Sequence, residues 1–161
     1  MMLLCRITDC LFLLAPRRIC IRSITSSVLY IDGEHYFDLP DNGEPIGDIS
    51  LDDNIQIIAV QASSNLGIVA GIVVSTSDGS IVTDITWKCT SVVEIGWTAI
   101  DYNDAAWPYA VPVDEADLKM YGEDKKCSSR AKYIWTAKRA GSYDQTVYCR
   151  AFFGMAIHLI S

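Results

Sequence analysis

The chain has 161 residues, of which 50% are hydrophobic and 20% are charged. This length and composition fit one globular domain and exclude a disordered chain. The formal net charge is −7, and an acidic surface disfavours binding to the phosphate backbone of nucleic acids.

Residues 1–26 form an N-terminal stretch with two alternative interpretations. The apolar run 11–15 is shorter than the core of a typical signal peptide, so as a leader it would be a degraded one. From about Arg18 onward, apolar and polar residues alternate with period 2, which favours a first β-strand. No run approaches the about 20 apolar residues of a transmembrane helix, so no transmembrane segment is expected. We therefore expect the main domain over residues 27–161.

Short β-rich runs separated by turns follow in the first half of this domain. Runs over 27–31 and 34–37 flank Asp32-Gly33, and this pair indicates a tight hairpin because both central positions need positive φ. The segment 38–48 is acidic and rich in glycine and proline, so it predicts a loop. The β-branched residues of 54–62 predict the next strand.

The middle of the chain is less regular. The apolar run 66–74 is long enough for a helix, but its glycines and β-branched residues favour a strand. A turn at 77–80 separates this run from a further segment over 81–89. Residues 101–106 fit one helical turn capped by Asp104.

The C-terminal part predicts strands over 131–137, 145–153 and 156–160. In the second of these, alternate residues from Val147 to Phe153 share one face. Many short strands separated by turns predict an all-β fold, either an antiparallel sandwich or a barrel, rather than alternating strands and helices.

Several short phrases occur in an order that resembles the galactose-binding-domain-like β-sandwich, a jelly-roll module common in extracellular and carbohydrate-active proteins. The resemblance covers about residues 27–153 and is carried by Tyr30–Gly33, Ile57–Val60, Thr83–Cys89, Gly96-Trp97 and Asp104–Trp107. It implies an antiparallel jelly-roll sandwich. The sequence departs from the family at Asp32, where asparagine is usual, and before Val28, where nothing matches.

The tryptophans have a structural and a functional interpretation. A tryptophan buries about 200 Å² and fixes the packing of one sheet on another. We therefore expect packing in the core or at its rim for all four, which are Trp87, Trp97, Trp107 and Trp135. The alternative is that one of them is a platform on which a sugar ring stacks.

The resemblance also implies a disulfide between Cys89 and Cys149, with Cys127 left as a free thiol. Because disulfides persist in oxidising compartments, an extracellular or secretory location is expected. No C-x-x-C pair occurs, and no cysteine and histidine have the spacing of a zinc site.

Ligand binding is expected in the loops, which collect at the two ends of a sandwich. The loops 38–48, 63–65, 119–129 and 138–144 contain polar and aromatic groups suited to sugar hydroxyls and rings. The candidate ligand-binding residues are Asp41, Asn42, Asn65, Tyr121, Arg139 and Tyr143. The acidic loop is either solvated or a site for a structural calcium ion, with Asp38, Asp41 and Asp48 as candidate ligands. No other cofactor is expected.

The resemblance implies a non-catalytic, lectin-like module that binds carbohydrates or glycoconjugates. Two alternatives remain, because a fold does not fix a function. One is an adhesion or scaffolding domain whose partners are cell-surface or extracellular proteins. The other is an accessory domain of a glycoside-processing enzyme. His35 and His158 lie in no catalytic motif, and no catalytic residue is expected.

Overall fold

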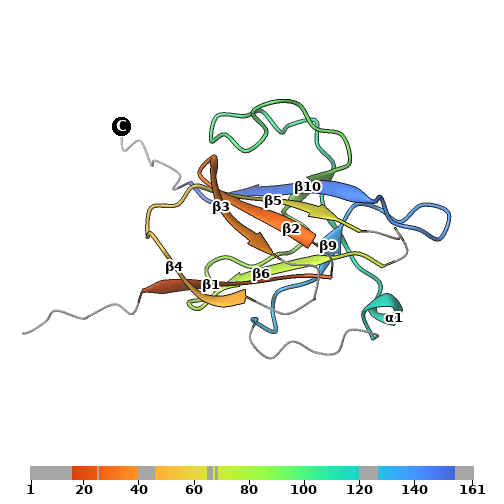
Figure 1. The fold of residues 1–161 in the computed structure, drawn as a ribbon, viewed down its shortest axis with the longest axis horizontal. Coiled ribbons are helices and arrows are strands. Elements are labelled where there is room, and N and C mark those ends of the chain that lie inside the picture. The colour runs from red at the N-terminus through yellow and green to blue at the C-terminus, as the bar shows by residue number, and fades with distance from the viewer. Residues whose placement is uncertain are drawn as a thin grey trace, which may run out of the picture.

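The computed structural model describes residues 16–24, 26–39, 46–64, 67, 69–119 and 127–154, and it is an antiparallel β-sandwich. Ten strands in these residues form two five-stranded sheets, one above the other in Figure 1. The all-β prediction is confirmed, and the stacking of two separate sheets decides for the sandwich over the barrel.

The two sheets are named here after the first strand that each contains. The β1 sheet has the spatial order β4 (Ile46–Leu51), β1 (Arg17–Ser23), β6 (Ile72–Thr76), β9 (Ile134–Trp135) and β8 (Val111–Pro112). The β2 sheet has the order β3 (Glu34–Leu39), β2 (Ser26–Ile31), β5 (Ile57–Ser63), β10 (Thr146–Phe152) and β7 (Lys88–Thr90). One short helix, α1 (Glu115–Leu118), follows β8.

Alternating apolar residues of both sheets fill the core between them. Ile19 and Ile21 of β1 and Leu29 of β2 are at most 1% exposed, and the side chains that alternate with them point to the outer faces of the sheets. Trp87 and Trp135 lie in the same core, and each indole N–H donates to a backbone carbonyl at 3.0 Å. These two tryptophans therefore pack the sheets together, with their polar atoms satisfied.

The hairpin between β2 and β3 forms as predicted, with positive φ at Asp32 and Gly33. The Asp32 carboxylate has a second role, because one of its oxygens accepts from the backbone N–H groups of Gln56 and Ile57 at 2.8 and 2.7 Å. Asp32 therefore fixes the loop that leads into β5, and both backbone donors are satisfied there.

Other elements differ from the sequence-based expectations. The predicted loop 38–48 contains the start of β4, which pairs with β1 at the edge of the sheet. Of the segment 81–89, only its last two residues belong to a named strand, and 131–137 contributes only the two residues of β9. The segment 66–74 ends in strand β6 rather than a helix. The predicted strand 156–160 lies outside the described residues.

No helix forms at 101–106, and the expected cap is wrong. The Asp104 carboxylate instead receives Lys88 Nζ on one oxygen and Arg150 on the other, both at 2.9 Å. Charged donors from β7 and β10 thus occupy both oxygens of this carboxylate. They bind a carboxylate more strongly than a backbone N–H does, so Asp104 does not cap a helix. The one helix described, α1, was not predicted.

Two disulfides stabilise the fold. Cys89 and Cys149 are directly opposite each other in β7 and β10, and both are buried, so the expected bond is present. The expectation of a free Cys127 is wrong, because Cys127 is bonded to Cys20 of β1. Cys20 is on the side of β1 away from Ile19 and Ile21, and the chain returns to this outer face at residue 127. Two disulfides are typical of proteins in an oxidising environment.

The outer face of the β2 sheet is covered by residues 91–110, which arch over β5 and β10 at the top of Figure 1. Trp97 packs between Tyr30 and Tyr148, with ring centroids 5.5 and 5.2 Å away, and Trp107 stacks on it at 6.3 Å. All four tryptophans thus pack in the interior or at its rim. This aromatic cluster around Trp97 packs on the side of the β2 sheet that faces away from the main core.

Candidate functional site: two clefts beside the Asp78 turn

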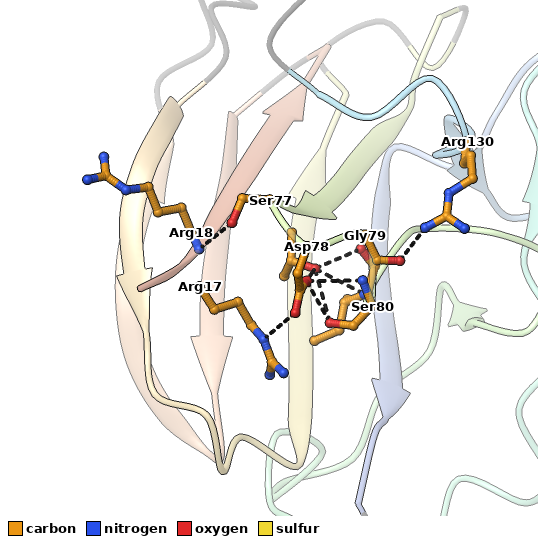
Figure 2. A network of polar contacts seen from close by, with 9 residues as sticks. Arg17, Arg18, Ser77, Asp78, Gly79, Ser80 and Arg130 are labelled. Atoms are coloured by element: carbon orange, nitrogen blue, oxygen red, sulfur yellow. Dashed lines mark hydrogen bonds and ion pairs between the residues drawn. The ribbon is translucent and has the colours of Figure 1, made fainter. Parts of the chain in front are cut away.

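The candidate site is built around a tight turn at Ser77–Ser80, called here the Asp78 turn. One Asp78 oxygen accepts from Thr76 Oγ1, Ser80 N and Ser80 Oγ at 2.6, 3.0 and 2.8 Å. The other oxygen accepts from Arg17 Nε at 3.0 Å, as Figure 2 shows. Burial alone would raise the pKa of Asp78, but the hydrogen bonds from Thr76, Ser80 and Arg17 hold it well below its usual value. Arg17 therefore balances the negative charge of Asp78, and the Asp78 carboxylate holds the turn in place.

The Asp78 turn is the wall between two clefts. The first, the face cleft, has a volume of about 720 Å³ and lies over the outer side of β1 and β6. Asp78 and Gly79 line it from the turn, and residues 127–129 line it from the segment tied down by the Cys20–Cys127 disulfide. Arg130 donates to the carbonyl of Gly79 and so holds this segment against the turn.

The second cleft, the end cleft, has a volume of about 520 Å³ and opens at one end of the sandwich. It is lined by Arg17, Ser80, Ile81, Phe153 and residues 53–56. The Phe153 ring contacts Trp87 edge to face at 6.0 Å, and its backbone N–H donates to the carbonyl of Gln56 at 2.6 Å. Core packing therefore holds the aromatic wall.

The polar wall of the end cleft is also fixed. Asp53, Asn54 and Gln56 are exposed, and Asp32 anchors the backbone of this loop through Gln56 and Ile57. An apolar ring thus faces a carboxylate and two amides on a loop of defined conformation. This combination suits a ligand with both hydroxyl groups and C–H surfaces.

Of the loops expected to bind ligand, 119–129 supplies residues 127–129 to the face cleft, whereas the described parts of the other three lie at the end opposite the end cleft. The pairing of Ser26 with Ser63, of Ser63 with Thr146 and of Ser27 with Leu39 places the end of β3, the end of β5 and the start of β10 at one end of the β2 sheet. The turn that contains Arg139 and Tyr143 precedes β10 there, on the right of Figure 1. The end cleft is at the other end, beside the start of β5.

The structure describes only some of the predicted site residues. Asp41, Asn42, Asn65 and Tyr121 lie outside the described residues, as does the side chain of Asp48. Arg139 is exposed, in a turn that it closes with Ser142. Tyr143 is only 5% exposed, and its hydroxyl is bonded to Asp117 and to the backbone of Asp114. Its ring is core packing, so it offers no face to a sugar.

Of the three candidate calcium ligands, Asp38 is the one whose side chain lies within the described residues. Asp38 Oδ1 accepts a hydrogen bond from His35 Nε2 at 2.9 Å, and the pair is exposed. In the part of the chain that the structure describes, no three histidine, cysteine, aspartate or glutamate side chains are placed to hold a metal ion.

Sequence reasoning interpreted 77–80 as a turn and went no further. A usable signal was present, because the pattern Thr76-x-Asp78-x-Ser80 surrounds an aspartate with hydroxyls that favour a local turn. The partnership of Asp78 with Arg17 had no such signal, since the two residues are 61 positions apart. The position of Phe153 beside residues 53–56 also had no signal in the sequence.

No protein-family model, curated protein or solved structure matches the chain. Within the described ranges, no helix is both long enough and apolar enough to cross a membrane. The chemistry of the two clefts is therefore the basis for assigning a function.

Proposed function

We propose that this protein is a non-catalytic glycan-binding module and that the end cleft holds a sugar ring. The observation that supports the proposal is the pairing of Phe153 with Asp53, Asn54 and Gln56 across one rigid cleft. The galactose-binding-like resemblance and the two-sheet sandwich favour the same function. The two disulfides favour an extracellular or secretory location for it.

The physical basis is the amphipathic nature of a sugar. One face of a hexose presents C–H groups that pack on an aromatic ring, while its hydroxyls need fixed donors and acceptors. The Asp53 carboxylate accepts, and the Asn54 and Gln56 amides both donate and accept. Because the cleft is open, we expect a dissociation constant in the micromolar to millimolar range, about −8 to −4 kcal/mol.

The test is a titration of ¹⁵N-labelled protein with neutral hexoses and their oligomers, with and without calcium, followed by NMR. We expect shifts at residues 53–56 and Phe153. Asn54→Ala and Gln56→Ala should each weaken binding about fivefold, which corresponds to about one lost hydrogen bond. Gln145→Ala is the matched control, because Gln145 is an exposed glutamine at the opposite end of the sandwich. Shifts elsewhere, or none at all, would refute a sugar site in this cleft.

A second candidate function is protein–protein adhesion, favoured by apolar side chains exposed on residues 91–110. Ile95 is fully exposed at 103% and Val92 at 76%, although Val93 and Trp97 of the same segment pack inward. Exposed apolar side chains on one covering segment would suit contact with a protein partner if they form a continuous patch. Ile95→Ser should leave sugar titrations unchanged and reduce binding to a protein partner. An effect of this variant on sugar shifts would argue against separate surfaces.

A further inference from the structure

Arg17 has hydrogen-bond donors at the end cleft that the fold leaves unused. Its Nε–H donates to one Asp78 oxygen at 3.0 Å, the contact that Figure 2 marks for this side chain. A guanidinium group has five N–H donors, so four remain on the two Nη atoms. Within the described residues, none of these four has a protein acceptor. Because the Arg17 side chain lines the end cleft and is 22% exposed, a ligand in the cleft can accept from it.

The fold also fixes the direction of these donors. Thr76 and Ser80 hold the other Asp78 oxygen through bonds of 2.6–3.0 Å, so the carboxylate that binds Arg17 is itself kept in place. The backbone of Arg17 pairs with Leu51 in the β1 sheet. Both ends of the Arg17 side chain are therefore anchored, and a ligand that binds the guanidinium group loses little free energy to ordering it.

A carboxylate in the same cleft has no charged partner among the residues that the structure describes. Leu51 ends β4 opposite Arg17, so the loop 53–56 begins close to Arg17. Asp53 is exposed in this loop and forms no ion pair there, because Arg17 is paired with Asp78. Two groups of opposite charge thus line one cleft without bonding to each other, and a ligand can contact both.

An aromatic ring supplies the apolar part of the cleft. Ile55 and Ile81 also line it, but they are only 8% and 3% exposed, so the Phe153 ring is the main apolar surface within reach of a ligand. This ring is held against Trp87. The cleft therefore combines a group that only donates, a group that only accepts and a ring of fixed position.

An acetamido group has the matching chemistry. Its N–H is a donor, its carbonyl oxygen is an acceptor, and its methyl group packs on an aromatic ring. Hydrogen bonds to a charged partner are about twice as strong as those between neutral groups, so both polar contacts favour binding. We infer that the end cleft recognises an N-acetylated sugar, with Arg17 donating to the acetyl carbonyl and Asp53 accepting from the amide N–H.

The inference rests on the proposed function, to which it adds a preference among sugars. A ring hydroxyl has its donor and its acceptor on one atom and carries no methyl group. An acetamido group has them on separate atoms, so it can bond to Arg17 and Asp53 together. The amides of Asn54 and Gln56 remain for the hydroxyls of the same sugar.

The experiment compares four probes by NMR on the ¹⁵N-labelled protein: a hexose, the matching 2-acetamido sugar, the matching 2-amino sugar and Nε-acetyllysine. The three sugars are used in both the gluco and the galacto configurations. We expect the 2-acetamido sugar to bind about tenfold more tightly than the hexose, with shifts at Arg17, residues 53–56 and Phe153. Nε-acetyllysine, which has the acetamido group without the sugar ring, should bind about tenfold more weakly than the 2-acetamido sugar.

Two variants test the charged contacts. Arg17→Met should bring the tenfold preference for the acetamido sugar close to one, because the carbonyl loses its donor. Asp53→Asn should reduce the preference to about threefold, because the acceptor of the amide N–H loses its charge. Asp52→Asn and Arg139→Met are the matched controls, since both residues are exposed and neither lines the cleft.

The preference is a ratio of two affinities measured on the same variant. Both sugars bind the same folded molecules, so a loss of stability in Arg17→Met leaves this ratio unchanged, whereas loss of the carbonyl contact lowers it. A preference that stays at tenfold in Arg17→Met would therefore overturn the role of Arg17. The shifts of the unmodified protein locate the site even if a variant folds poorly.

The other outcomes separate this inference from the proposed function. Equal binding of the hexose and the acetamido sugar at the end cleft would overturn the inference and leave the proposed function standing. Tighter binding of the 2-amino sugar would show that Asp53 attracts a cation, which would also overturn it. Nε-acetyllysine that binds as tightly as the acetamido sugar would overturn the assignment to sugars. No shift with any probe would overturn both proposals.

Discussion

The two outer faces of the sandwich have opposite character. Part of the outer face of the β2 sheet is covered by residues 91–110, whose aromatic rings close over Tyr30 and Tyr148. The β1 sheet is crossed by residues 127–130, which touch it through a disulfide and two serines and leave a polar cleft of about 720 Å³. The first face is built for packing, and the second has room for a ligand.

The surroundings of the arginines on the two sheets show the same difference. Arg150 of β10 is 1% exposed and bonds to the carbonyls of Ala99 and Tyr102 and to the Asp104 carboxylate, each at 2.9 Å. Arg17 of β1 is paired at a partly exposed site with Asp78. The buried arginine holds a covering segment in place, whereas Arg17 holds the Asp78 turn beside the two clefts. Similar residue types thus help to cover one face and border an open cleft on the other.

The largest expected effect comes from Arg150→Met, which would break the covering of the β2 sheet. The change leaves the part-buried carbonyls of Ala99 and Tyr102 without this donor and Asp104 with Lys88 as its charged partner. We expect a loss of about 4 kcal/mol in the free energy of unfolding, measured by chemical denaturation. Arg139→Met, at an exposed turn, is the control and should cost less than about 0.5 kcal/mol. Similar losses for both variants would show that Arg150 does not hold this segment.

The next effect concerns the cleft disulfide. The double variant Cys20→Ala/Cys127→Ala should lose about 3 kcal/mol of stability, a typical value for a disulfide, because the unfolded chain loses a cross-link between residues 107 positions apart. The loss should leave the amide shifts of the aromatic cluster around Trp97 unchanged. Denaturation and NMR of the same sample measure both quantities.

The two disulfides should also differ in their reactivity toward a thiol reductant. Cys20–Cys127 lines an open cleft, while both cysteines of Cys89–Cys149 are buried in the core. Under native conditions a dithiol should therefore reduce the cleft disulfide first. Alkylation followed by mass spectrometry would show the order, and earlier labelling of Cys89 would contradict this view of the two faces.

The smallest effect is a pH dependence that belongs to the Asp78 turn. Because folding lowers the pKa of Asp78, its ionised form stabilises the fold above its unfolded pKa of about 4, and this contribution disappears as the pH falls further. The side chain is partly exposed, so we expect only about 1 kcal/mol. Unfolding curves between pH 6 and pH 2 should show a smaller change for Asp78→Asn than for the unmodified protein. Identical curves would mean that the charge of Asp78 contributes nothing.

Local patterns were enough for much of the β2 sheet. The hairpin at Asp32-Gly33 requires positive φ at adjacent positions, which is a property of the residues themselves. The alternation in 145–153 gave the faces of β10, because side chains point to opposite sides of a strand wherever it lies. The edge strand β4 was not predicted, since its glycine-rich neighbourhood has the composition of a loop and its pairing with β1 supplies the missing stability.

The candidate site was largely beyond sequence reasoning for a related reason. The expected ligand loops were chosen by composition, and Tyr143 was chosen as an aromatic residue in a loop, yet tertiary packing buried it. Cys127 was expected to be free because the resemblance implied a bond between Cys89 and Cys149 and matched nothing in the segment before Val28. Strand β1 joins the sheet, and its Cys20 faces the returning chain.

The amino-acid sequence by itself determined the all-β class, the hairpin at Asp32-Gly33 and the inward direction of the apolar residues, because each depends on the conformational preferences of neighbouring residues. Only the tertiary structure decided that Arg17 meets Asp78, that Phe153 faces residues 53–56 and that Ser128 lies over Ser75. These contacts join residues far apart in the chain. They depend on the register of strands and on which face of a sheet a later segment crosses, and no local preference encodes either.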